Sequence, residues 1–353
     1  MNADLIFYLV VFAAMSAVII GAGVLLAKSG DRIADITGLG GLLIGLVLVA
    51  AATSLPEIAV AVSAVITEGS PDLAIGNLFG SNMANMALLA IVDLAWRGKV
   101  WQHVGTGHAR TAAVAIALTA IAVLAVLQPI GIQIGWVGVE SIIIFVGFLS
   151  LIAWTHRSST PAVPTGEVSH EQVSAEDAEH QHLSGAEVTS RRAILFSIRW
   201  DLAKFGIAAL VILVSAPILV NAADGIGREA DLSDSFVGAS FLAFSTSLPE
   251  LATAVAAVRI GAFDLAVGSL LGSNAFNMAI IFIVDLVYTD GAVLSAVSAT
   301  QAFVGVGAIL LMAIVLAGII HGARTRAWKL EPGAGMTLVV YFILMYQIFN
   351  AGT

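Results

Sequence analysis

The sequence predicts an all-α polytopic membrane protein, in which ten transmembrane helices form two inverted-topology repeats of five helices each. The 353 residues are 59% hydrophobic and only 11% charged, whereas a soluble domain carries about 25% charged residues. Long apolar segments recur along the whole chain, and a polar motif from the first half returns in the second half. The chain has no Cys, which excludes a disulfide framework and thiolate metal ligands.

A helix needs about 20 mostly apolar residues to cross the hydrocarbon core of a bilayer. By that measure we count ten spans, and Gly or Pro interrupts the second, third, seventh and eighth of them. The first span is too long for the core of a signal peptide and has no basic flank before it, so we expect it to be retained. The ten spans are approximately 5–27, 39–66, 72–95, 111–128, 134–154, 201–223, 233–258, 264–288, 299–320 and 333–350.

The basic residues predict the orientation. If the connections alternate sides, fourteen of the fifteen Lys and Arg residues lie on the side opposite the N-terminus, and the exception is Arg228. The positive-inside rule makes that side cytoplasmic, so we expect both termini outside a cell (inner) membrane. The fourteen are Lys28, Arg32, Arg97, Lys99, Arg110, Arg157, Arg191, Arg192, Arg199, Lys204, Arg259, Arg324, Arg326 and Lys329.

We divide the chain into a first repeat (1–154), a linker (155–200) and a second repeat (201–353). The linker is rich in Ser, Glu, His and Pro, and we expect it to be an acidic, flexible, cytoplasmic segment. Five spans per half make the second half enter the membrane from the opposite side, as in many secondary transporters. The net charge of -9 and the lack of a basic, aromatic patch predict no nucleic-acid partner.

The internal repeat consists of two sequence blocks in each half. Ala52–Val65 matches Ser245–Val258 at 10 of 14 positions, and both copies contain Thr-Ser-Leu-Pro-Glu. Asp72–Leu88 matches Asp264–Ile280 at 11 of 17 positions, and both copies contain Gly-Ser-Asn. The motifs place carboxylates, hydroxyls and amides inside apolar spans, where polar groups are costly and usually functional.

In the first block a proline precedes the carboxylate. Pro56 lacks an N–H and its ring clashes with the preceding turn, so the helix must break or kink there. Carbonyl groups freed in this way are tolerated in a membrane only when they are buried in protein or line a cavity. No Lys or Arg lies in the motif spans to pair with Glu57 or Glu250. We therefore expect these carboxylates to bind a cation or protons.

In the second block a hydroxyl and an amide lie four residues apart, which places them on one helix face. The pairs are Ser81 with Asn85, and Ser273 with Asn277. A set made only of oxygens suits calcium or sodium, and suits magnesium less because magnesium dehydrates reluctantly. The alternative interpretation, favoured for any lone Ser, is that these groups merely hydrogen-bond neighbouring helices.

The paired motifs resemble the alpha-repeats of the calcium/cation antiporter superfamily, and specifically its sodium/calcium exchanger branch. The resemblance covers nearly the whole chain except the linker. It implies exchange of sodium for calcium by alternating access, with no cofactor beyond the transported ions, Ca²⁺ and Na⁺. It also implies a central site made by Glu57, Asn85, Glu250 and Asn277, with Thr53, Ser54, Ser81, Thr246, Ser247 and Ser273 and the main-chain oxygens of Ala50 and Ala243 in support.

One residue departs from the family pattern, because several exchangers carry Asp at the position of Asn277. The site then holds two formal negative charges rather than three. One calcium ion would neutralise it, while three sodium ions would leave it at +1.

Other functions remain as alternatives. A proton-coupled or other-cation-coupled calcium or magnesium exchanger would use Glu57 and Glu250 as proton carriers. A hydrolase using Ser54 or Ser247 is disfavoured, because no His or Lys in the same spans can act as its base. A channel is disfavoured because inverted repeats with broken helices are typical of alternating access. One chain contains the whole site, so a monomer in the lipid bilayer suffices for function.

Overall fold

The computed structural model describes residues 3–67, 69–96, 100–105, 107–159, 185–229, 246–322 and 332–351. These residues are almost entirely helical, and one two-stranded hairpin is the only sheet among them. The first half contains α1 (Ala3–Thr37), α2 (Gly40–Ile44), the π-helix η1 (Gly45–Val49), α3 (Ala50–Thr53), α4 (Leu55–Ile66), α5 (Pro71–Ala95), α6 (Val100–His103), α7 (Gly107–Leu127), β1 (Gln133–Ile134), β2 (Val137–Gly138) and α8 (Val139–Ser159). The second contains α9 (Gly185–Glu229), α12 (Leu248–Arg259), α13 (Phe263–Val287), the 3₁₀-helix η3 (Val293–Ala296), α14 (Ala299–Gly322) and α15 (Pro332–Ala351).

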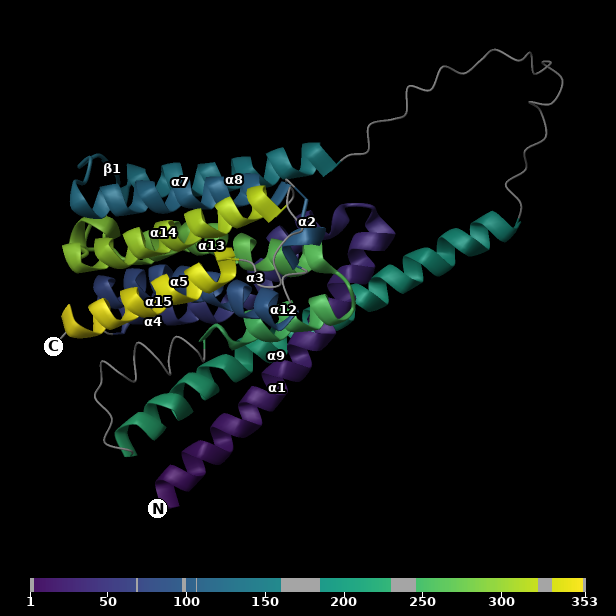
Figure 1. The fold of residues 1–353 in the computed structure, drawn as a ribbon, viewed down its shortest axis with the longest axis horizontal. Helices are drawn as coiled ribbons and strands as arrows, with labels where there is room; N and C mark the ends of the chain where they lie inside the picture. Colours follow the sequence, from purple (N-terminus) through teal and green to yellow (C-terminus); the bar gives the residue numbers. More distant parts are fainter. Residues whose placement is uncertain are drawn as a thin grey trace, which may run out of the picture.

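Helices α5 and α13 form the centre of the molecule. In their most apolar stretches 78% and 72% of the residues are buried, against 22% to 50% in the other candidate spans. Helix α13 packs against α5, α7, α8 and η1. Figure 1 shows most helices running alongside one another, while α1 and α9 cross obliquely beside them and pack along each other. The Gly-Ser-Asn blocks therefore lie on the two most enclosed helices.

The described helices agree with the predicted membrane class. Seven are long and apolar enough to cross a bilayer, and α2 to α4 together form an eighth segment that bends by 45°. Helix α15 contains a shorter apolar segment, Gly333–Ile348. The predicted span 233–258 lies partly outside the described residues, and α12 is the helix found in its described part. The count of ten spans therefore stays a prediction.

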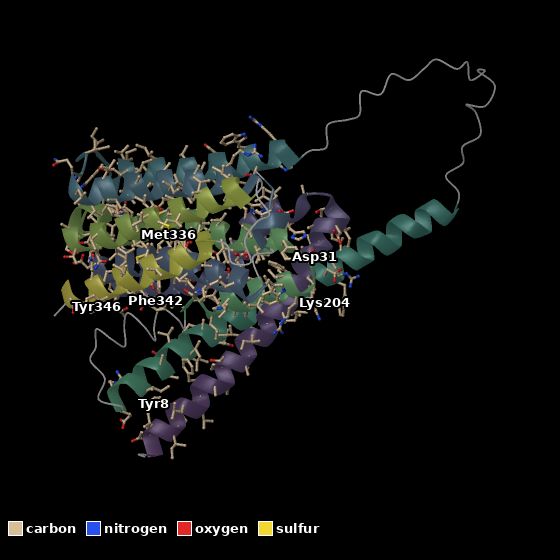
Figure 2. All side chains as sticks on the ribbon, viewed as in Figure 1. Tyr8, Asp31, Lys204, Met336, Phe342 and Tyr346 are labelled. Atoms are coloured by element: carbon tan, nitrogen blue, oxygen red, sulfur yellow. The ribbon has the colours of Figure 1, made fainter. Side chains whose placement is uncertain are left out.

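The surface that would face lipid is apolar. Met336, Phe342 and Tyr346 of α15, labelled in Figure 2, are 57%, 66% and 69% exposed. Large exposed apolar side chains also occur along α1 and α9. Contiguous exposed apolar surface is rare on soluble proteins, so these faces match the lipid-facing sides of membrane helices.

Tight turns join the two blocks of each motif. Gly69, between α4 and α5, has a φ of 60°, and Gly261, between α12 and α13, has a φ of 84°. Only glycine adopts such values without strain. Helix α5 then begins with Pro71 in its first turn, and the Ser70 hydroxyl accepts a hydrogen bond from the Leu73 N–H at 3.3 Å. Helices α4 and α12 are thus each followed directly by a central helix.

The predicted span 134–154 is wrong at its start, because its first residues form a hairpin and α8 begins at Val139. Asp285, at the end of α13, holds this hairpin in place. Its carboxylate accepts hydrogen bonds from the N–H groups of Gly138, at 2.8 Å, and Val293, at 2.6 Å. Asp285 thus has a structural role at the end of α13.

The two helices that flank the linker extend into its predicted bounds, 155–200. Helix α8 continues to Ser159 and α9 starts at Gly185, while residues 160–184 lie outside the described part. Beyond the linker, Arg32 of α1 lies 3.3 Å from the Asp201 carboxylate of α9, and Lys204 lies 3.4 Å from it. Figure 2 labels Lys204 near Asp31, where the two helices meet.

Close approach of α13 to the second span depends on glycine. A Cβ atom at Gly272 would lie 2.7 Å from Leu46 Cα, and one at Gly45 would lie 2.8 Å from the Leu265 carbonyl oxygen. Real Cβ contacts are essentially never this short. Small residues let membrane helices pack backbone to backbone, and here they bring the broken helix against α13.

Candidate ion-binding site

In the first motif copy the helix breaks at Ser54, between α3 and α4, and in the second copy α12 starts directly after Ser247. Ser54 has φ -86° and ψ 8°, and Ser247 has φ -86° and ψ 3°, so neither residue is helical. Helices α4 and α12 start at the next residue with proline in the first turn. This agrees with the break predicted at Pro56. It places Glu57 and Glu250 in the first turn of a helix, where a carboxylate is favoured by the helix dipole.

The predicted side chains are buried together rather than spread along their helices. Glu57 is 1% and Glu250 2% exposed. The Ser81 hydroxyl donates to Glu57 Oε1 at 3.5 Å, and the hydroxyl oxygens of Thr53 and Ser273 lie 3.4 Å apart. These contacts join the broken helix of the first half to both central helices.

Ten of the predicted site side chains and the Ala50 residue are buried, and Ala243 lies outside the described residues. Six buried oxygens in this group have no hydrogen-bond partner within the described part of the chain. They are Ser54 Oγ, Glu57 Oε2, Asn85 Oδ1, Ser247 Oγ, Glu250 Oε2 and Asn277 Oδ1. Buried polar atoms almost always have partners, so six free oxygens in one region indicate a place for a ligand that accepts their lone pairs.

The amide groups of the site are held by Asn82 and Asn274, the asparagines of the two Gly-Ser-Asn motifs. Asn85 Nδ2 donates to Asn274 Oδ1 at 3.0 Å, and Asn277 Nδ2 donates to Asn82 Oδ1 at 3.0 Å. Asn82 Nδ2 donates to the main-chain carbonyl of Asn274 at 3.2 Å, and Asn274 Nδ2 donates to that of Asn82 at 3.2 Å. The only signal in the sequence was an uncharged amide three residues before each predicted ligand.

The donor set suits a hard cation. No three His, Cys, Asp or Glu side chains converge anywhere in the described ranges, so the site combines two carboxylates with neutral hydroxyl and amide oxygens. Calcium and sodium accept such all-oxygen sets of mixed charge. Helix α3 also ends at Thr53, just beside the carboxylates, and the C-terminal end of a helix favours positive charge.

The sequence profile of a known family, described as "Sodium/calcium exchanger protein", matches residues 7–154 and 200–349. These ranges include both motif copies and leave out most of the linker. The chain belongs to the sodium/calcium exchanger protein family. As its description says, this is a family of ion exchangers, which are transporters rather than enzymes.

Several relatives resemble this exchanger-family chain over much of its length. The putative antiporter CaxA of Alkalimonas amylolytica is 27% identical over 93% of this chain and 96% of its own. The inner membrane protein YrbG of Escherichia coli is 30% identical over 72% of this chain and 71% of its own. Sodium/potassium/calcium exchanger 1 of Gallus gallus is 31% identical, but over only 36% of this chain and 20% of its own.

A solved structure of the sodium-calcium exchanger NCX_Mj has the same fold as this exchanger-family chain. It superposes with a TM-score of 0.69 and covers 98% of this chain and 99% of its own, at 19% sequence identity. At that identity the likeness shows the fold alone.

A further pair of polar side chains, which no sequence motif indicated, joins α7 to α13. His108 Nε2, near the start of α7, lies 2.8 Å from Asp264 Oδ1 at the start of α13, and His108 is 1% exposed. The ring of His103 stacks on Phe263 with centroids 4.7 Å apart. The pair joins the two halves at one end of the central helices, away from the unpartnered oxygens.

Proposed function

We propose that the chain exchanges sodium for calcium by alternating access, through one central site to which both halves contribute. One observation carries the proposal: the six unpartnered buried oxygens, two of them from carboxylates, belong to side chains already expected to bind the ion. Leaving that many buried polar atoms unpaired costs about 1–3 kcal/mol each. A transported cation offsets this cost whenever it occupies the site.

In this proposal Glu57 and Glu250 supply the charge, and Asn85 and Asn277 supply amide oxygens. The hydroxyls of Thr53, Ser54, Ser81, Thr246, Ser247 and Ser273 and the main-chain oxygens of Ala50 and Ala243 complete the ligand set. Calcium is bound by six to eight oxygens, whereas sodium ions would each use a subset of them. Because the two cations share ligands, binding of one competes with the other, which is the requirement for exchange.

The proposed architecture is ten spans in two inverted repeats, with both termini outside and the linker in the cytoplasm. Glu57 lies just after the helix break at Ser54, and Glu250 lies in the first turn of α12; broken helices at a repeat interface are the usual substrate site of such transporters. The carboxylates have no basic partner among the described residues around the site. If the protein switched between its outward-open and inward-open conformations with the site empty, two uncompensated charges would be enclosed in a low-dielectric interior. That cost couples movement to ion loading and makes exchange obligatory.

The test is calcium uptake into proteoliposomes loaded with sodium, compared with vesicles loaded with choline, at one pH on both sides. We expect uptake only with internal sodium. Uptake that ignores sodium and follows an imposed pH gradient would overturn sodium coupling and leave a proton-coupled exchanger. Uptake that never saturates with calcium would instead indicate a channel.

A further inference from the structure

We propose that Asn82 and Asn274 are positioning residues, which hold the amide oxygens of Asn277 and Asn85 toward the transported ion. This inference rests on the proposed function, because it concerns ligands of the same site. Both asparagines are completely buried, and neither has a side-chain atom among the unpartnered ones. They therefore act through the neighbouring amides rather than by binding the ion themselves.

The polarity of the network starts from the main chain. The carbonyl of Asn82 can only accept, so the group that Asn274 turns toward it must be Nδ2, at 3.2 Å. The Oδ1 atom of Asn274 then faces Asn85, whose Nδ2 donates to it at 3.0 Å. An amide oxygen and nitrogen point in different directions from one carbon, so Asn85 Oδ1 is turned away from Asn274. That oxygen is one of the six without a partner.

Reversing any one side-chain amide of this network would break at least one of its hydrogen bonds. If Asn85 turned over, its oxygen would face Asn274 Oδ1, and two acceptors would meet without a hydrogen between them. If Asn274 turned over as well, its oxygen would face the Asn82 carbonyl. The main-chain oxygen of Asn82 thus fixes the orientation of the Asn274 amide and, through it, that of the Asn85 amide. Hydrogen bonds between neutral groups are enough to orient the proposed ligand oxygen.

The second half repeats the arrangement in the opposite direction. The carbonyl of Asn274 receives Asn82 Nδ2 at 3.2 Å, and Asn82 Oδ1 receives Asn277 Nδ2 at 3.0 Å. Asn277 Oδ1 is left unpartnered in its turn. Each positioning residue therefore serves the ligand on the other central helix, so the pairs that matter are Asn82 with Asn277 and Asn274 with Asn85.

This crossing allows a sharp test by double-mutant cycles on sodium-driven calcium uptake. Asn82→Leu keeps the side-chain volume but removes the acceptor that holds Asn277. We expect it to raise the KM for calcium about tenfold while kcat stays within twofold, because a freely rotating ligand weakens ion binding. In the Asn82→Leu background, Asn277→Ala should then raise the KM less than threefold further. Asn82 does not bind the amide of Asn85. In the same background, Asn85→Ala should therefore raise the KM by the same factor as it does in the parent.

The equivalent variants of the other repeat provide the matched cycle for the pair Asn274 and Asn85. They are Asn274→Leu, Asn85→Ala and Asn277→Ala. Asn82→Ala and Asn274→Ala are measured alongside, because a Leu side chain that fails to fit would otherwise hide the result. All variants are compared only as monodisperse, folded protein.

Coupling confined to the crossed pairs supports the positioning role. Penalties that multiply independently in all four combinations overturn it, even though exchange itself persists. An unmodified protein without sodium-driven calcium uptake would overturn the proposed function and this role with it.

Discussion

The hydroxyl oxygens of Thr53 and Ser273 lie 3.4 Å apart, although 220 residues separate them in the sequence. Thr53 Oγ1 also lies 3.1 Å from the Val49 carbonyl oxygen and 3.3 Å from that of Ala50. The end of α3 and the middle of α13 therefore meet in one cluster of oxygens. Ala50, whose main-chain oxygen the resemblance implied as a ligand, belongs to this cluster.

Thr53→Val keeps the shape of this side chain and removes its hydroxyl. We expect the KM for calcium to rise about tenfold, equivalent to about 1.4 kcal/mol, because one oxygen of the site is lost. Thr53→Ser, which keeps the hydroxyl, should stay within threefold of the parent. The matched control is Thr119→Val, since Thr119 is equally buried but only bonds to Ala115 in its own helix. Equal effects of the Thr53 and Thr119 variants on calcium uptake would contradict a ligand role.

Glu57→Gln should abolish sodium-driven calcium uptake while the protein still inserts and folds. The amide keeps an acceptor for the Ser81 hydroxyl, but a bound calcium ion would be left with an uncompensated positive charge inside the membrane. Glu140→Gln is the control, because Glu140 is also buried and its carboxylate accepts from the Ile130 N–H, outside the site. Uptake and thermal stability are measured for both variants. Exchange that survives in the Glu57 variant would exclude this carboxylate from the site.

Asn277→Asp should change which step of the cycle carries charge. With two carboxylates, a site holding three sodium ions is at +1 and one holding calcium is neutral. A third carboxylate would lower both values by one and move the voltage sensitivity, about 2.3 kcal/mol per charge per 100 mV, to the calcium-loaded step. Electrical recording from proteoliposomes under sodium or calcium concentration jumps measures this. Asn277→Ala, which removes the ligand without adding charge, controls for ligand loss. Identical currents in the Asp variant and the parent would show that position 277 does not contact the ion.

Gly272→Ala should destabilise the protein by about 1–3 kcal/mol, as expected for overpacking. The added Cβ would meet the main chain of η1 at Leu46, which cannot move aside as a flexible side chain would. The control is Gly206→Ala on the exposed side of α9, where no atom of the described residues lies within 4 Å. Thermal unfolding in detergent measures both. A Gly206 variant that loses as much stability as the Gly272 variant would refute the steric explanation.

Local patterns predicted the helix break before Glu57 and the placement of the polar motif side chains inside apolar helices, because both depend on short-range rules. Pro56 lacks an N–H and clashes with the preceding turn, which favours a break or kink, and a carboxylate inside a long apolar segment usually faces the protein interior. The pairing of Asn82 with Asn277 could not be predicted in this way. It depends on how α5 and α13 are placed against each other, and no periodicity within either helix specifies that register.

The hairpin at residues 133–138 escaped prediction for a different reason. Its residues continue an apolar segment, so hydropathy alone assigned them to the following span. The structure shows why the helix starts later: Gly135 has a φ of 69°, which ends any helical path, and Asp285 holds Gly138 from a distant helix. The His108–Asp264 contact was missed because a single buried His gives no signal until its partner is placed beside it.

The crossed bonds between the central helices also bear on biosynthesis. Asn82 and its partner Asn274 are 192 residues apart. At a synthesis rate of about 5–20 residues per second, the first half must wait roughly 10 to 40 s for its partner groups to emerge from the ribosome. During that interval its amides are unpaired at the centre of an unfinished bundle. These crossed hydrogen bonds can therefore form only after α13 has been synthesised and has packed against α5.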